Sequence, residues 1–148
     1  MERIVIGIDT GVHTGLCIYD SEERSIKQIC CVGIVKALDI VGGYAERHAS
    51  IKVYFEDARQ RKWIPREQSF SEVKGRAMGA GSVKRDCQIW EEFLLDRGIP
   101  FEKVAPMHNI TKLSAEQFCK LSGWTGRTNE HSRDAAGLIL GLIRNGKD

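Results

Sequence analysis

Apolar and β-branched residues dominate three segments at the start of the chain, residues 3–9, 14–20 and 25–33. The pairs Thr10-Gly11 and Asp20-Ser21 separate these segments and favour tight turns. Strands joined by short turns lie next to each other in a sheet, so the pattern predicts an antiparallel meander of three strands.

A helix and two further strands complete the predicted sheet. Residues 35–49 carry apolar side chains at helical spacing, and residues 51–56 and 99–105 have the composition of strands. A strand reached through a helical crossover normally runs parallel to an earlier strand, here the first. We therefore predict an α/β fold, a five-stranded mixed sheet of order 3-2-1-4-5 flanked by helices.

Four helices are predicted in the second half of the chain. Helical periodicity, caps and glycine stops place them at residues 70–78, 82–97, 114–121 and 130–144. Ser82 is expected to cap the second of them. Ser114 and Gln117 form a capping-box pattern at the start of the third, and Gly123 ends it.

An acid ends both the first and the fourth predicted strand, at Asp9 and Glu56. Side chains alternate between the two faces of a strand, so the isoleucines of the first strand face one way and Asp9 faces the other. The same alternation applies to Glu56 in the fourth strand. Because these strands are expected to run in parallel, both acids should project from the same face at the same end of the sheet. Asp57 should face the opposite way, and we interpret it as structural or exposed.

Length and composition indicate one globular domain over residues 1–148. The chain is 42% hydrophobic, no apolar run approaches the roughly 20 residues that span a bilayer, and the start lacks a signal-peptide pattern. We therefore expect a cytoplasmic protein without membrane contact. The five cysteines include no C-x-x-C pair, which argues against a disulfide framework and a zinc finger.

The net charge of +2 is unevenly distributed. Residues 59–85 contain eight basic and two acidic residues, a net charge of +6, so the remainder of the chain carries −4. This asymmetry predicts a polyanionic partner, with a solvated basic loop as the alternative. The candidate nucleic-acid-binding residues are Arg59, Arg61, Lys62, Trp63, Arg76, Lys84 and Arg85.

A third acid lies on the last predicted helix, at Asp134, with His131 three residues before it. At this spacing the two side chains share one face of a helix. Carboxylates on two strand ends and one helix suit Mg²⁺, which takes few protein ligands and keeps several waters. Two such ions can promote phosphodiester cleavage. The alternatives are that Asp134 favours the helix start through the macrodipole and that His131 is a surface residue.

The chain resembles the RuvC-type Holliday junction resolvases of the RNase H-like superfamily over nearly its whole length. The segment from Ile6 through Asp9 to Gly15 is similar to the opening of that family, and Glu56 matches its second acid. The segment 81–95 resembles the central helix of the family, and His131-x-x-Asp134-Ala-Ala resembles its C-terminal element.

The resemblance implies a metal-dependent, homodimeric endonuclease that nicks a four-way DNA junction symmetrically. Asp9, Glu56, His131 and Asp134 would hold Mg²⁺, and Lys112 falls where the family carries a supportive lysine. An imidazole ligand would also suit Mn²⁺ as a substitute. Thr10 stands where the family usually has proline. Trp63 is a candidate for base stacking, with a hydrophobic anchor as the alternative.

Three other functions remain open from the sequence. A nuclease of this fold acting on RNA–DNA hybrids or other branched DNA would use the same acids. A non-catalytic junction-binding protein would use the basic segment alone. The turn from Asp9 to Gly15 also resembles the first phosphate loop of actin-like kinases, although the chain is short for two such domains.

Overall fold

The computed structural model describes residues 1–61, 70–106 and 112–145, and within these ranges the side chains of 70–78, 80 and 142–145 are not described. The strands are β1 (Ile4–Asp9), β2 (Thr14–Asp20), β3 (Ser25–Val32), β4 (Ile51–Glu56) and β5 (Phe101–Val104). The helices are α1 (Ile34–Arg47), α2 (Phe70–Asp96), α3 (Ala115–Ser122) and α4 (Glu130–Asn145), with a short 3₁₀ turn at Ala58–Gln60.

The five strands form one mixed sheet of order β3-β2-β1-β4-β5. β1 pairs antiparallel with β2, and β2 with β3. β4 runs parallel to β1 and β5 parallel to β4. This confirms the predicted fold class and strand order. The carboxyl ends of β1 and β4 therefore meet at one edge of the sheet.

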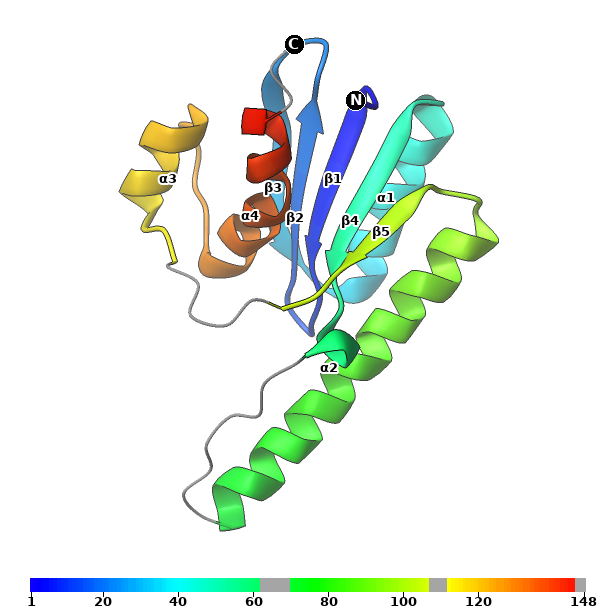
Figure 1. Cartoon of the computed structure of the whole chain (residues 1–148), viewed down its shortest axis with the longest axis vertical. Helices are drawn as coiled ribbons and strands as arrows, with labels where there is room; N and C mark the ends of the chain where they lie inside the picture. The colour runs from blue at the N-terminus through cyan, green and yellow to red at the C-terminus, as the bar shows by residue number, and fades with distance from the viewer. Residues whose placement is uncertain (62–69, 107–111, 146–148) are drawn as a thin grey trace.

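Helices cover both faces of the sheet (Figure 1). On one face, alternate residues of β1 and β4 such as Ile6 and Val53 pack with Val41 of α1 and Trp90 of α2. On the other face, a smaller cluster joins Val5 and neighbouring strand residues to α4 and to Phe118 of α3. Side chains alternate along a strand, so the residues of β1 and β4 that lie between Ile6, Val53 and their equivalents face α4. In the part of the chain that the structure describes, no helix has the length and apolar character needed to cross a membrane.

The prediction of two helices between residues 70 and 97 is wrong, because α2 is a single helix of 27 residues. Ser82 therefore lies inside the helix and does not cap it. Glycines such as Gly81 cost a helix only about 1 kcal/mol each relative to alanine, which the continuous backbone hydrogen bonding of a long helix tolerates. Figure 1 shows the first half of α2 projecting beyond the sheet.

α4 lies unusually close to the sheet because β1 and β2 present glycines to it. A Cβ atom added to Gly7 would lie 2.2 Å from the carbonyl oxygen of Ala135, and one added to Gly15 would lie 2.0 Å from the carbonyl oxygen of His131. Both distances are far inside van der Waals contact. Only glycine permits this backbone-to-backbone packing, which sets the position of the first turns of α4.

We expect Gly7→Ala to destabilise the fold, because its methyl group would overlap the backbone of α4 at Ala135. Overpacking of this kind typically costs about 1–3 kcal/mol. The matched control is Gly137→Ala on α4 itself, where no atom lies within 4 Å of the added Cβ. The control should be neutral or gain up to about 1 kcal/mol of helix propensity. Urea unfolding measures both, and equal stabilities of the two variants would contradict the packing described.

Candidate active site

Asp9 and Glu56 lie side by side at the end of the sheet. Ile8 of β1 is paired with Phe55 of β4 in the parallel register, so the next residue along each strand is an acid. Their alternation places both on the face covered by α4, opposite Ile8 and Phe55, which are buried against α1 and α2. Each carboxylate is partly buried. The predicted convergence of the two strand-end acids is present in the structure.

The start of α4 brings His131 to Asp9. Nδ1 of the imidazole lies 2.9 Å from Oδ2 of Asp9, a hydrogen-bond distance. Gly15 is the antiparallel partner of Asp9 on β2, and its missing Cβ admits the backbone of His131. The close approach of α4 to the sheet therefore explains why residues 122 positions apart meet.

Reciprocal caps fix the start of α4. The backbone N–H of Ser132 donates to the side-chain oxygen of Asn129 at 2.8 Å, and the backbone N–H of Asn129 donates to the Ser132 hydroxyl at 2.9 Å. Ser132 is fully buried. Such caps satisfy N–H groups that have no partner within the helix. The helical turn that carries His131 and Asp134 is thus fixed both by these capping hydrogen bonds and by its packing against β1 and β2.

Lys112 lies at the same site, although it precedes α3. Its ammonium group donates to Oδ2 of Asp134 at 3.1 Å and to Oε1 of Glu130 at 2.5 Å. These two acceptors raise the pKa of Lys112 to about 12, so the side chain carries a positive charge. Sequence reasoning assigned Glu130 no role at the site. Its position four residues before Asp134, on the same face of a helix, is the signal that could have identified it.

The three acids repel one another electrostatically. The pKa of Glu56 is raised, mainly by burial and then by the charges of Asp9 and Asp134. The pKa of Asp9 is also raised, again by burial first and by Asp134, although the hydrogen bond with His131 opposes the shift. Lys112 lowers the pKa of both groups. These mutual effects indicate that Asp9, Glu56 and Asp134 share one electrostatic site.

The chemistry of this site fits a hard divalent cation. Partly buried carboxylate oxygens under mutual repulsion are the donors that Mg²⁺ prefers, and a cation between them would relieve that repulsion. In the conformation described, Asp9 is paired with His131 and Asp134 with Lys112. Among the described residues, no three His, Cys, Asp or Glu side chains are already gathered around a common point as metal ligands would be.

The strand end that carries Glu56 contacts both the turn after β1 and the helix α2. The Thr10 hydroxyl donates to the Glu56 carbonyl at 3.0 Å, and the thiol of Cys87 on α2 lies 3.6 Å from the same oxygen. The Thr10 oxygen and the Cys87 sulfur are themselves 3.5 Å apart. Cys87 is fully buried. Cys87 therefore packs as a small hydrophobic residue of the core.

An ion pair between the buried Asp57 and the exposed Arg59 follows immediately after Glu56. Asp57 accepts two hydrogen bonds from the Arg59 guanidinium, at 2.7 and 3.0 Å, and Arg59 also pairs with Glu91 of α2. Burial raises the pKa of Asp57, but the hydrogen bonds from the side chain and backbone N–H of Arg59 and from the Gln60 side chain, together with the charge of Arg59, lower it below its ordinary value. Asp57 therefore has a structural role, and Arg59 is held within the fold by two carboxylates.

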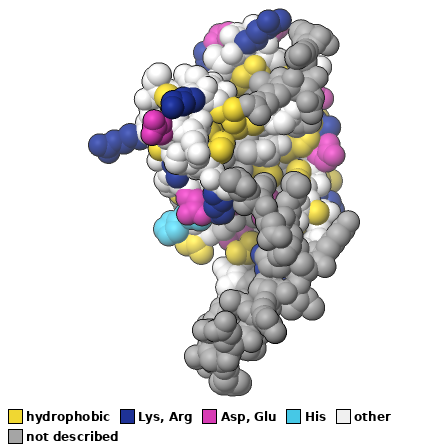
Figure 2. All heavy atoms as spheres, turned by 60° about the vertical axis from the view of Figure 1, so that its left-hand side comes forward, with side chains coloured by type: hydrophobic (Ala, Val, Ile, Leu, Met, Phe, Trp, Pro, Cys, Tyr) yellow, Lys and Arg dark blue, Asp and Glu magenta, His cyan; other side chains and the backbone are white. Residues whose placement is uncertain are grey.

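The remaining candidate nucleic-acid-binding residues fall into two groups. Arg61, Lys84 and Arg85 are exposed, the last two on α2. Lys62 and Trp63, and the side chain of Arg76, lie outside the described residues. Figure 2 shows acidic, basic and histidine side chains close together on the side of the molecule that carries α3 and α4.

We expect Glu56→Gln to be more stable than the wild type at neutral pH. The folded-state pKa of Glu56 lies above its ordinary value of 4.5, so the folded protein binds more protons than the unfolded chain. As the pH rises above 4.5, Glu56 loses its proton more readily in the unfolded chain than in the folded protein, and the free energy of unfolding of the wild type falls. The advantage of the variant should grow from pH 4 to pH 7 in metal-free urea unfolding.

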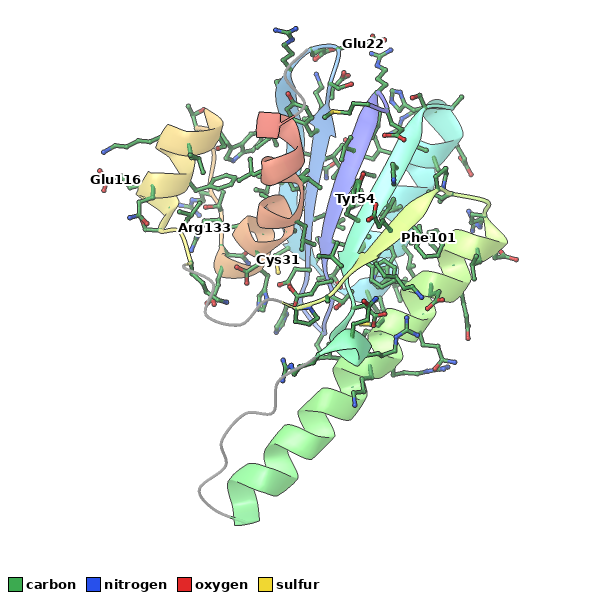
Figure 3. All side chains as sticks on the ribbon, in the orientation of Figure 1. Glu22, Cys31, Tyr54, Phe101, Glu116 and Arg133 are labelled. Carbon is green, nitrogen blue, oxygen red and sulfur yellow. The ribbon has the colours of Figure 1, made fainter. Side chains whose placement is uncertain are left out.

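The control for this measurement is Glu116→Gln, which removes an exposed carboxylate of α3 (Figure 3). Its stability relative to the wild type should change little with pH, because exposed ion pairs contribute little. A stability difference between Glu56→Gln and the wild type that does not change with pH would show that the pKa of Glu56 is not raised in the folded protein.

Comparison with known proteins supports the fold. No model of a known protein family matches the sequence, and no curated protein matches it. Among solved structures, T. thermophilus RuvC in complex with a Holliday junction substrate superimposes with a TM-score of 0.57 and 16% sequence identity. The alignment covers 93% of this chain and 91% of that chain. The chain therefore has a RuvC-like, RNase H-like α/β fold.

Proposed function

We propose that this protein is a metal-dependent endonuclease that cleaves branched DNA, most specifically a four-way junction by paired symmetric nicks. The observation that carries the proposal is that Asp9 and Glu56 end neighbouring strands within electrostatic reach of Asp134 on α4, to which Lys112 donates a hydrogen bond. The fold shared with a junction-bound RuvC favours branched DNA over an RNA–DNA hybrid as the substrate.

Asp9, Glu56, His131 and Asp134 would hold the metal, proposed to be two Mg²⁺ ions, with Mn²⁺ as a substitute. Bound ions of this kind generate a nucleophilic water and offset charge on the attacked phosphate. In the reaction, the water oxygen would form a bond to phosphorus and give up a proton to solvent, while the bond from phosphorus to one ester oxygen breaks and that oxygen takes up a proton from solvent to leave as a hydroxyl group. The hydrogen bond between His131 and Asp9 orients both groups before the metal binds.

Lys112 contributes a positive charge at the same place. Its ammonium group already contacts Asp134 and Glu130, so it lies at the edge of the carboxylate cluster and carries its proton at neutral pH. A fixed ammonium group next to the reacting phosphate stabilises the negative charge that develops on its oxygens. Lys112 would therefore act on the phosphate while the carboxylates act on the metal.

The basic residues around the site support a nucleic acid as the substrate. Arg61 follows the Glu56 strand closely enough to lower the pKa of Glu56, and Lys84 and Arg85 lie within one helical turn of Cys87, which contacts the Glu56 carbonyl. DNA bound along α2 would thus reach the acids. Two opposed strands require two such sites, which a homodimer with twofold symmetry would provide.

We expect Asp9→Asn and Glu56→Gln to abolish nicking of a labelled four-way junction in Mg²⁺ while junction binding is retained. Each removes a charge needed for the metal and leaves the exposed basic residues unchanged. Asp39→Asn, on an exposed position of α1, is the matched control and should cleave like the wild type. Denaturing gels measure the nicks, and a gel shift in EDTA measures binding.

Two results would contradict this assignment. Undiminished nicking by Asp9→Asn would exclude it from the catalytic site. Preferential cleavage of a sequence-matched RNA–DNA hybrid would contradict the proposed junction substrate but would not contradict the proposed metal site. Mg²⁺ should also raise the thermal unfolding temperature of the wild type more than that of Asp9→Asn, because a ligand stabilises the state that binds it.

Junction affinity should fall steeply with salt, because each neutralised phosphate releases counterions. Replacing Lys84 or Arg85 with glutamine should weaken binding uniformly across DNA sequences and reduce the slope of log K against log salt by about one. Lys36→Gln, an exposed lysine of α1, is the control and should leave the slope unchanged. Fluorescence anisotropy between about 50 and 200 mM salt measures the slope, and an unchanged slope for both variants would remove this part of α2 from the interface.

A further inference from the structure

Arg133 makes two contacts that the proposed reaction does not use. Its Nε donates to the backbone carbonyl of Leu113 at 3.0 Å, and its Nη1 donates to the Thr128 hydroxyl at 2.9 Å. The side chain is partly buried. Figure 3 shows Arg133 labelled between α3 and the start of α4. Both donors therefore bind groups of the protein itself, one of them on the segment that precedes α3.

Leu113 directly follows Lys112, so these contacts bear on the proposed catalytic lysine. Two consecutive residues of the segment before α3 are bound to two consecutive residues of α4. Lys112 binds Asp134 through its ammonium group, and Leu113 binds Arg133 through its carbonyl. The Leu113 side chain also packs against the smaller hydrophobic cluster, and Ser114 caps α3. The backbone is thus held at residue 113, next to the residue whose side chain reaches the site.

We propose that Arg133 is a positioning residue that holds Lys112 against Asp134. The inference rests on the proposed function for its catalytic consequence. A lysine side chain has several rotatable bonds, and ordering it in one place costs conformational entropy. The hydrogen bond from Arg133 to the Leu113 carbonyl restricts the backbone position from which the Lys112 side chain extends. Glu130 and Asp134 accept hydrogen bonds from its ammonium group. Arg133 acts through Lys112 and does not touch the reacting phosphate.

Replacing residues that orient metal ligands typically costs roughly 10- to 100-fold in activity, and we take the same scale for a residue that orients Lys112. We therefore expect Arg133→Gln to lower kcat by roughly that factor and to leave the KM for the junction near the wild-type value. Arg133→Lys keeps one donor and should recover part of the loss. Arg127→Gln is the matched control, because it removes the same charge from an exposed residue of the segment between α3 and α4.

A double-mutant cycle separates positioning from a purely structural effect. If Arg133 acts through Lys112, the variant carrying both Arg133→Gln and Lys112→Met should be no slower than Lys112→Met alone. If the two residues acted independently, the two reductions in kcat would multiply, because free-energy changes at unconnected sites add. Multiplicative losses, or a raised KM with unchanged kcat in Arg133→Gln, would overturn the proposal and indicate a structural or DNA-binding role.

Hydrogen exchange gives a readout that does not depend on cleavage. Exchange in peptides covering residues 112–118 should accelerate in Arg133→Gln and remain as in the wild type in Arg127→Gln. Absence of nicking by the wild-type protein on every branched or hybrid substrate would refute the proposed function, and hydrogen exchange would still decide whether Arg133 holds this segment. Unchanged exchange in Arg133→Gln would refute the positioning role itself.

Discussion

The contact between α4 and the two glycines of β1 and β2 is the constraint on which the site depends. Gly7 and Gly15 let the helix backbone lie against the strands, with no room for even one added carbon atom. Gly15 is also the sheet partner of Asp9. The same contact that closes the smaller core therefore places His131 and Asp134 at the end of β1. Packing and site geometry are set here by one interaction.

That geometry has an electrostatic cost which the fold offsets only in part. Asp9 and Glu56 are partly buried, which raises the pKa of both carboxyl groups, and the charge of Asp134 raises them further. Lys112 and His131 supply the nearby favourable contacts. Perturbed carboxyl groups gathered at one place are typical of functional sites, where the arrangement serves chemistry at the expense of stability.

Much of the fold follows from local patterns in the sequence. Turn residues and β-branched runs identified the strands, the capping box identified α3, and the alternation of residues in β1 and β4 placed Asp9 and Glu56 on one face. The continuity of α2 was missed because glycine and serine near position 80 look like a helix boundary, whereas a long helix tolerates them. The resemblance indicated Lys112, but its pairing with Glu130 and the contacts of Arg133 depend on tertiary packing.

α2 joins the proposed DNA contacts to the proposed chemistry through a stiff element. Its 27 residues span about 40 Å at 1.5 Å per residue, and Cys87 contacts the backbone of Glu56 within one turn of Lys84 and Arg85. The distance from a phosphate bound by Lys84 or Arg85 to the acids would therefore be set by the geometry of the helix. If α2 binds DNA as proposed, its fixed spacing would select nucleic acids by the spacing and direction of their backbones and not by their bases.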